Sequence, residues 1–354
     1  MRRLQDVYFL RPLEVQEDEA RRHERLNTVL MLDDTRNKVE TILGSIPQQF
    51  DIEFAKSKYP IGKQDHRNRV LLQELEARNT LLSAICVSLN DLLRTLRGSD
   101  AVTIEMEQML LSLHYRRPPD IWLRNWTYSR KSLGAYLDLV HKSNAFFNTW
   151  LFAGFPTSSW LPAFFFPNLL LNTTSINFAQ SCKIGIEMVS LCYDILETDP
   201  QSTSMMTGIF LTGLSLTGAC WNFSQGKLHP LVTQSRPEAD SRRVSAKSKF
   251  KEEGDGGSLI FAASSCWSVP VLHVKPLKTP ARIEGQLDTA GSKLYFCPMY
   301  RTNCRKNVNV KVVHPYASSG FIVDVVLPCS APLNVCDPQH LYARLNASFL
   351  VEVD

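Results

Sequence analysis

Hydrophobic and polar positions along the chain follow two different periods, and the change falls near residue 183. Before this point apolar residues recur three or four positions apart, which is typical of helices that bury one face. After it they alternate in short runs bounded by Gly, Pro, Asn and Asp, which is typical of strands. Helices followed by strands predict an α+β fold.

The clearest helical pattern covers residues 66–97, where one apolar stripe runs the whole length and Gly98 follows as a stop signal. Shorter patterns predict helices over about 35–43, 101–114, 131–152 and 159–179. Gly44 and Pro47 end the first of these, and Pro118 and Pro119 follow the second. The stripe consists of Val70, Leu71, Leu75, Leu81, Leu82, Ile85, Leu89, Leu92, Leu93 and Leu96.

The second half of the chain predicts short strands, whose number and spacing indicate an antiparallel sandwich or barrel. Residues 235–258 interrupt them with many charges, serines and glycines, so we expect a mobile surface loop there. The predicted strands cover 184–196, 208–221, 266–277, 293–302, 307–316, 320–328 and 346–354.

The apolar tract 146–171, which contains "AFFFPNLLL", raises the question of a membrane span. A span needs about 20 consecutive apolar residues, but asparagines, threonines, serines and three prolines interrupt this tract. We therefore expect buried helices joined by a Pro-containing turn. The first 30 residues contain no apolar run of signal-peptide length, which predicts a cytosolic protein with reduced cysteines.

Composition sets only broad limits on function. A length of 354 residues predicts roughly two domains. Hydrophobic residues make up 44% and charged residues 21%, which is ordinary for a soluble globular protein. The net charge of +4 is too small and too mixed to indicate a nucleic-acid partner.

Sequence motifs of common enzymes are missing from the chain. It contains no Walker phosphate loop, dinucleotide-binding glycine pattern, nucleophile elbow or zinc-protease helix motif. Cys297/Cys304 and Cys329/Cys336 are too widely spaced for a zinc knuckle, so buried thiols are preferred over a metal site with His314 or His340. We therefore predict no catalytic, cofactor-binding or metal-binding residue, and an unrecognised enzyme site is the least favoured alternative.

Arg242-Arg243-Val244-Ser245 has the pattern of a basophilic kinase site within the charged loop. A phosphate on Ser245 would add about −2 charge beside several lysines. The competing interpretation is a solvated polar segment without regulation.

One segment resembles a known family. Residues 158–180, "SSWLPAFFFPNLLLNTTSINFAQ", are similar to the C-terminal region of dynein heavy chains. The Gly-Ala-x-Trp strand (218–221) and the compact tail resemble the axonemal branch more than the cytoplasmic one. Residues 73–98 and "GLSLTGACW" (213–221) also match the family in order, and the resemblance covers about 36–354. Departures include Ser132, Pro162, Ala163 and Thr217, the loss of a Thr-Thr-Gly-His segment, and an apparent insertion at about 238–263.

The resemblance implies a domain organisation. Residues 1–35 would be a charged N-terminal segment, and 36–116 a helical bundle like the small lobe that ends the sixth AAA+ module. Residues 117–354 would be the dynein C-terminal domain, with a helical layer at 117–182 and a small antiparallel β-barrel at 183–354 that carries a mobile loop at about 235–263.

It also implies a function: a structural and regulatory module of an ATP-driven, minus-end-directed microtubule motor, with no ATPase site in this chain. ATP and Mg would belong to the parent motor. Expected partners are the rest of the AAA+ ring, the intermediate, light intermediate and light chains of the complex, and microtubules indirectly, but neither nucleic acid nor membrane. The expected location is the cytoplasm, the cytoskeleton and the axoneme of a cilium or flagellum.

The resemblance marks residues expected to pack layers together or form an interface. A free-standing binding module that kept this fold without a motor is the alternative function. The marked residues are Trp122, Trp160, Phe164, Phe165, Phe166, Pro167 and Trp221.

Overall fold

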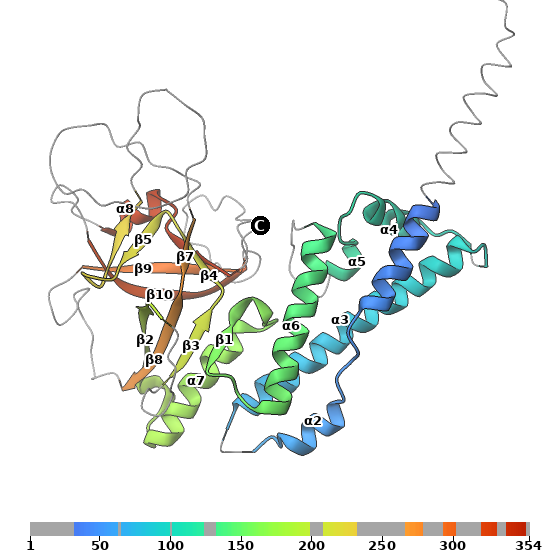
Figure 1. The fold of residues 1–354 in the computed structure, drawn as a ribbon. Coiled ribbons are helices and arrows are strands. Elements are labelled where there is room, and N and C mark those ends of the chain that lie inside the picture. The colour runs from blue at the N-terminus through green and yellow to red at the C-terminus, as the bar shows by residue number, and fades with distance from the viewer. Residues whose placement is uncertain are drawn as a thin grey trace, which may run out of the picture. The chain divides into compact units, whose positions relative to one another are not determined.

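The computed structural model has an α+β fold and divides into two compact units. A helical unit comprises residues 1–60 and 71–148, and a sheet unit comprises 61–70 and 149–354. Figure 1 shows the helices and strands of each unit. The structure describes residues 32–62, 65–99, 101–123, 132–198, 208–231, 266–278, 293–301, 320–330 and 338–351.

The described helices before residue 154 confirm the four predicted there. The long stripe of the 66–97 prediction is buried apart from Leu96, which is half-buried. Gly98 follows the longest helix at φ 76°, and its N–H donates to the Thr95 carbonyl at 3.0 Å. The helices cover 32–45, α2 (Ile52–Lys58), α3 (Arg67–Leu96), α4 (Ile104–His114), α5 (Asp120–Leu123) and α6 (Leu133–Ala153).

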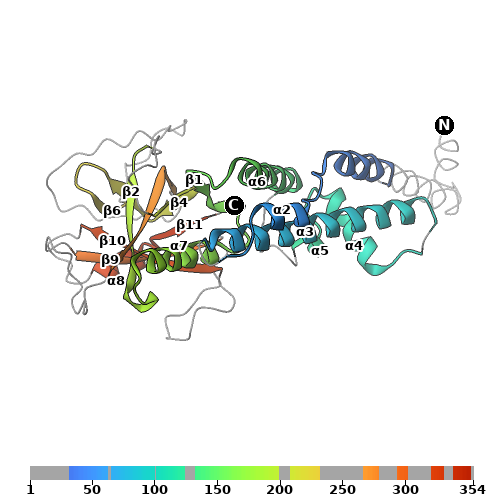
Figure 2. The same cartoon turned by 90° about the horizontal axis from the view of Figure 1, so that it is seen from below.

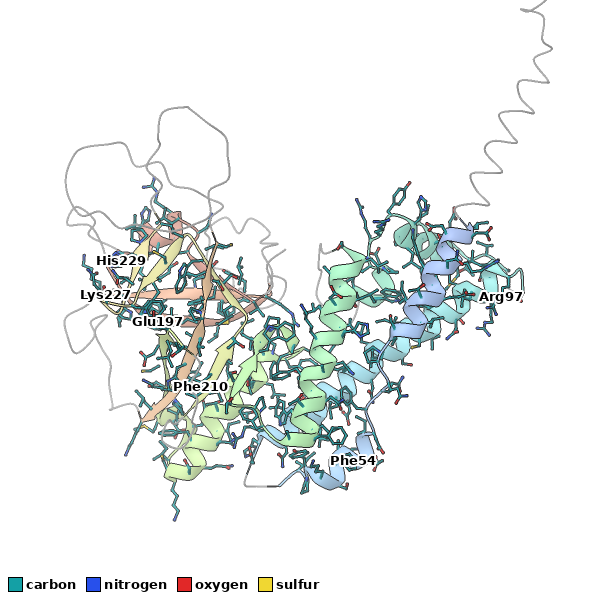
Figure 3. The ribbon with its side chains drawn as sticks, viewed as in Figure 1. Phe54, Arg97, Glu197, Phe210, Lys227 and His229 are labelled. Carbon is teal, nitrogen blue, oxygen red and sulfur yellow. The ribbon has the colours of Figure 1, made fainter. Side chains whose placement is uncertain are left out.

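The core of the helical unit contains a buried arginine. Arg78 of α3 donates from Nη1 to the Ser143 hydroxyl of α6 at 2.6 Å, and its guanidinium lies 4.6 Å from the centre of the Phe147 ring. Such contacts lower the cost of burying the charge. Figure 3 shows Arg97 just beyond the end of α3, where it forms an ion pair with Glu40 at 3.5 Å.

The described residues of the sheet unit form two sheets and two further helices. Figures 1 and 2 both show α7 (Pro167–Cys182) beside the smaller sheet, where it packs against β2. The strand orders are β1-β3-β8-β2 and β5-β6-β10-β9-β11-β4-β7. The other elements are β1 (Ser158–Trp160), β2 (Val189–Leu196), β3 (Ile209–Thr212), β4 (Leu214–Thr217), β5 (Ala219–Asn222), β6 (Lys227–Pro230), β7 (Cys266–Val269), β8 (Val271–Lys278), β9 (Lys293–Tyr300), β10 (Phe321–Cys329), α8 (Pro338–Arg344) and β11 (Ser348–Leu350), with short 3-10 turns at Leu161–Ala163 and Ile186–Met188.

The predicted antiparallel barrel is wrong for the described strands. Both sheets are open and mixed, because β1 pairs with β3, β6 with β10, and β9 with β11 in parallel. Alternation of apolar residues reports which face of a strand is buried, but it carries no information on strand direction or closure. On the smaller sheet, Phe210 of β3 stacks on His273 of β8 with ring centres 4.3 Å apart, and Figure 3 labels Phe210 there.

Two predicted strands are divided in the structure. Residues 208–221 form β3, β4 and β5, because Gly213 and Gly218 adopt φ values of 79° and 70° and turn the chain. Residues 266–277 form β7 and β8, which separate at Pro270, a residue without an N–H for the ladder. Of these strands, β3 and β8 join the smaller sheet, whereas β4, β5 and β7 join the larger one.

The helix predicted over 159–179 begins later than expected. Residues 158–160 form β1, a 3-10 turn follows, and α7 starts at Pro167, whose missing N–H is tolerated in the first turn of a helix. Trp160 and the three phenylalanines therefore precede the helix. The apolar content was correctly assigned to the core, but its helical period was not.

Short elements without a long pattern were missed, namely α2, α5, β6 and α8. The strands predicted over 184–196, 293–302, 320–328 and 346–354 are confirmed in part by β2, β9, β10 and β11. The predicted strand 307–316 and loop 235–258 lie outside the described residues, as do 1–31. The domain boundaries inferred from the resemblance stay a prediction. None of the helices described is both long and apolar enough to cross a bilayer.

Candidate functional site

The aromatic segment, residues 160–167, runs from the end of β1 to the start of α7 and changes from buried to exposed along its length. Phe164 is fully buried and Phe165 is 9% exposed, whereas Phe166 is 40% exposed. Pro167 is buried at the first position of α7. Two of the three phenylalanines therefore belong to the core, and the third contributes apolar surface.

Arg301, immediately after β9, holds the backbone of this segment. Its Nη2 donates to the Phe164 carbonyl at 2.6 Å and its Nη1 to the Phe165 carbonyl at 2.8 Å. The arginine is only 6% exposed. Buried carbonyls need partners, and neither of these is in a helix or strand, so the guanidinium satisfies both at once.

Aromatic rings extend the packing on the other side of Phe164. Trp150 lies 6.2 Å from Phe164 and 5.0 Å from Phe155, centre to centre, the latter edge-on. Arg67 lies over the Phe155 ring at 4.8 Å. These contacts connect the aromatic segment to the first turn of α3 inside the sheet unit.

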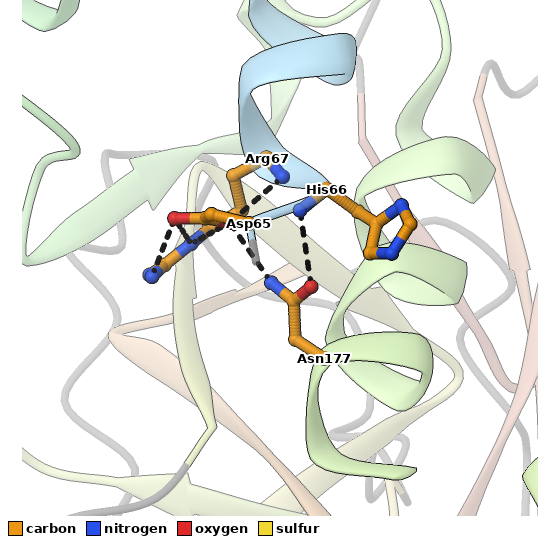
Figure 4. Close-up of polar contacts among 4 residues, drawn as sticks. All are labelled: Asp65, His66, Arg67 and Asn177. Carbon is orange, nitrogen blue, oxygen red and sulfur yellow. Dashed lines mark hydrogen bonds and ion pairs between the residues drawn. The ribbon is translucent and has the colours of Figure 1, made fainter. Parts of the chain in front are cut away.

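Polar contacts at the start of α3 involve Asp65, His66, Arg67 and Asn177 (Figure 4). Asp65 Oδ1 accepts from the Arg67 N–H at 2.9 Å and from Asn177 Nδ2 at 3.0 Å. The Asn177 side-chain oxygen accepts from the His66 N–H at 3.1 Å. Asn177 of α7 thus bonds to both of the residues that directly precede α3.

The Asp65 carboxylate is also the electrostatic centre of this cluster. Partial burial raises the pKa of Asp65, but the hydrogen bonds and positive charge of Arg67, together with Asn177, outweigh it and lower the pKa below its usual value. The charged form is therefore favoured in the fold. A negative charge here also suits the amino end of a helix.

The three predicted tryptophans have different surroundings. Trp160 is half-buried against the β3–β4 turn, where a Cβ on Gly213 would come within 2.6 Å of its ring. Trp221 of β5 is buried in the larger sheet. Trp122 belongs to the helical unit, where its ring N–H donates to the Ser88 hydroxyl at 2.9 Å and its ring stacks on Tyr136. Ser245 lies outside the described residues.

The chemistry available around the aromatic segment is packing and hydrogen bonding. A cavity of about 210 Å³ beside α7 is lined by Arg67, Asn177, Phe178 and Ile209 among others. In the ranges that the structure describes, no three His, Cys, Asp or Glu side chains gather in a way that could hold a metal ion. The described thiols Cys297 and Cys329 are buried as expected, and burial raises the pKa of Cys329 to about 11.

Sequence reasoning missed Arg301 and Asp65. Asp65 had a usable signal, because an aspartate just before a helical pattern is a capping residue. Arg301 had none, since its partners lie 136 and 137 positions earlier and are backbone carbonyls.

Residues 8–238 match the family model that describes the C-terminal domain of dynein heavy chains. The protein belongs to this family. The match includes both the aromatic segment and α3, so it confirms the resemblance drawn from those residues. It extends from the helices into the strands of the sheet unit.

This member of the dynein family is also similar to curated axonemal heavy chains. It is 28% identical over 292 residues to dynein axonemal heavy chain 12 of Homo sapiens, covering 82% of its own length and 8% of that protein. It is 27% identical to dynein axonemal heavy chain 1 of Rattus norvegicus and 25% to dynein axonemal heavy chain 3 of Mus musculus. In each case 83% of the present sequence and 6% of the relative are covered. The protein thus spans less than a tenth of these relatives.

Proposed function

We propose that this protein is the structural and regulatory C-terminal part of an axonemal dynein heavy chain, an ATP-driven motor that moves toward microtubule minus ends. The observation that carries the proposal is the family match over 8–238, which includes the aromatic segment. The similarity to three axonemal heavy chains supports the axonemal branch.

The aromatic segment supplies the physical role in this proposal. Phe164 and Phe165 hold the helices and sheets of this part together, since a buried Phe stabilises by about 1.5–3 kcal/mol. Phe166, with its exposed ring, and Trp160 then contribute to the surface that docks on the rest of the motor. The parent heavy chain carries the ATPase and its ATP and Mg, whereas this part contains no catalytic or cofactor residue of its own. Residues 36–116 act as the helical lobe of the sixth AAA+ module, and the sheets form the terminal body.

Partners follow from the same proposal. The direct partner is the remainder of the AAA+ ring, and the intermediate, light intermediate and light chains are reached through the complex. Microtubules are contacted only indirectly, and the location is the axoneme of a cilium or flagellum within the cytoskeleton. Neither nucleic acid nor a membrane is a partner.

The first test is the size and location of the native polypeptide. An antibody against a peptide of residues 238–258 is used on denaturing gels of isolated axonemes and of the soluble fraction. We expect a band far above 40.1 kDa in the axonemes. A single band at 40.1 kDa in the soluble fraction would contradict the motor proposal and favour the free-standing binding module.

Ser245 is proposed as a regulatory phosphorylation site on its sequence pattern alone. We expect the native protein to carry phosphate on Ser245, and Arg242→Ala to reduce it because basophilic kinases read the upstream arginines. Phosphopeptide mass spectrometry gives the occupancy, with Ser241→Ala as the control variant. Repeated detection of only the unmodified peptide would end this hypothesis.

A further inference from the structure

Ser132 is an exposed residue directly before α6, and two basic residues precede it in the sequence. These are Arg130 and Lys131, which lie outside the described residues, and the apolar Leu133 follows. The Ser132 hydroxyl oxygen accepts from the Ala135 N–H at 3.4 Å, which places it at the start of the helix. Basophilic protein kinases read basic residues on the amino side of a serine. Ser132 has both this pattern and the exposure that such an enzyme needs.

Two arginines that follow α4 are held next to this serine. The Leu133 N–H donates to the Arg116 carbonyl at 2.8 Å, although the two residues are distant in the sequence. The Arg117 N–H donates to the Ser112 carbonyl at 2.8 Å. These bonds fix the backbone of both arginines beside the residue that directly follows Ser132.

The guanidinium groups of Arg116 and Arg117 are available to an anion. Both side chains are exposed, and within the described part of the chain neither forms an ion pair with a carboxylate. The pKa of Asp34 is lowered first by its hydrogen bond to Lys38 and less by the charge of Arg116, so Asp34 already has a closer cation. Arginine binds phosphate with two parallel hydrogen bonds. An unmodified serine offers these two cations no charge.

We propose that Ser132 is a phosphorylation site and that Arg116 and Arg117 bind its phosphate. A basophilic protein kinase transfers the γ-phosphoryl group of ATP to the Ser132 hydroxyl oxygen. The bond between this group and ADP breaks, the bond from the serine oxygen to phosphorus forms, and the serine proton leaves to solvent. The phosphate adds about −2 charge and three acceptor oxygens.

The phosphate would act on the packing of the helical unit. Leu133 and Tyr136 in the first turn of α6 are buried, and the Tyr136 ring stacks on Trp122 of α5. A phosphate held by the two arginines ties the start of α6 to the end of α4 and so stabilises this packing. The inference goes beyond the proposed motor function. It differs from that for Ser245, which rests on a sequence pattern alone.

The first test measures the melting temperature of the full-length protein with and without a phosphate placed on Ser132 during synthesis. We expect the phosphate to raise the melting temperature by about 2–4 °C, and high salt to reduce the gain. In the double variant Arg116→Gln/Arg117→Gln the phosphate should add less than about 1 °C. The control Arg344→Gln, at an exposed arginine of α8, should keep the full gain.

Each variant is compared with its own unphosphorylated form, so any effect of the glutamines on folding cancels. An equal gain with and without the two arginines, or no gain at all, would overturn their role in binding the phosphate.

A second test asks whether kinases use the site. The full-length protein is incubated with MgATP and a set of basophilic kinases, and phosphopeptide mass spectrometry gives the occupancy of Ser132. We expect phosphate on Ser132, a several-fold loss with Arg130→Gln, and none with Ser132→Ala. Phosphate on other serines only, with Ser132 unmodified by every kinase, would refute the site.

Discussion

At the scale of single residues, side chains that bond to backbone do more for this fold than pairs of charges on its surface. Exposed ion pairs such as that of Lys56 with Glu53 contribute at most about 1 kcal/mol. Arg301 and Asp65, by contrast, satisfy backbone groups that no regular element can satisfy. Substituting Arg301 should therefore destabilise the fold more than removing an exposed ion pair, and substituting Asp65 should change how stability depends on pH.

Replacing Arg301 with methionine should destabilise the protein by about 2–4 kcal/mol, because it leaves the buried Phe164 and Phe165 carbonyls without a donor. Methionine retains much of the apolar stem of arginine, so packing changes little. Urea unfolding followed by tryptophan fluorescence gives the free energy. The control Arg344→Met, at an exposed arginine of α8, should change it by less than about 0.5 kcal/mol. Equal effects of the two variants would refute the role of Arg301.

Asp65 should make stability depend on pH in the acid range. Its folded pKa lies below the unfolded value, so its contribution is fully present above the unfolded pKa of about 4 and is lost as pH falls through the folded pKa. Asp65→Asn should therefore cost about 1 kcal/mol at pH 7 and almost nothing at pH 2.5. Unfolding curves at both pH values test this. The exposed Asp138→Asn serves as control, and a difference independent of pH would contradict the expectation.

At the scale of elements, the sequence predicted what depends on long runs and failed where one residue redirects the chain. The apolar stripe of α3 has ten members, so an error at one position does not change the period. Strand direction and partner choice depend on turns and on contacts between distant segments, such as the parallel pairing of β1 with β3 across some fifty residues. No local pattern contains that information, and the barrel was wrongly predicted for this reason.

In the candidate site, too, the sequence predicted which residues are buried but not where they lie relative to the helix. Burial of Phe164 and Pro167 followed from apolar content, but no period predicted that Phe164 precedes α7 or that Pro167 is its first residue. Phe166 is exposed and is the N-cap residue of α7, a boundary that the helix predicted over 159–179 did not contain. The partners of Arg301 lay beyond the reach of sequence reasoning altogether.

Gly218 should tolerate no side chain. It turns the backbone between β4 and β5 at φ 70°, and a Cβ there would lie 2.2 Å from the Leu345 carbonyl oxygen. Gly218→Ala should cost about 3 kcal/mol or more, from backbone strain and a clash with main chain. Gly226→Ala, at φ 61° with nothing within 4 Å, carries only the strain of about 1–2 kcal/mol. Thermal unfolding of the two variants gives the comparison, and similar losses would show that the clash relaxes.

At the scale of the whole molecule, the protein matches the C-terminal domain of dynein heavy chains and spans less than a tenth of the length of its axonemal relatives. The boundary between its two units falls within a helix, since residues 61–70 cluster with the sheets and residues 71–148 cluster with the helices. Helix α3 therefore belongs to both units, and its first turn carries the Asp65 cluster. If the proposed function holds, we expect the isolated protein to act through packing and docking contacts.

The isolated protein should neither bind nor hydrolyse MgATP, because it contains no Walker phosphate loop. We expect no rise in melting temperature with millimolar MgATP and no phosphate release above a blank without protein. A saturable rise in melting temperature would contradict this, because any ligand that binds only the folded state stabilises it. Magnesium with a non-nucleotide polyphosphate serves as the control for ionic effects.

The position of β11 has a consequence for synthesis. It is the last described strand in sequence order, yet it lies inside the larger sheet between β9 and β4. It is parallel to β9 and antiparallel to β4. Without residues 348–350 the strand order divides into two parts, β5-β6-β10-β9 and β4-β7, and the edges of β9 and β4 that β11 pairs in the folded sheet have no partner strand. Exposed edges are prone to pair with other polypeptides. The polypeptide is therefore prone to pair with other polypeptides until β11 has been synthesised and has left the ribosome. A premature stop before Ser348 would leave both edges without their partner strand.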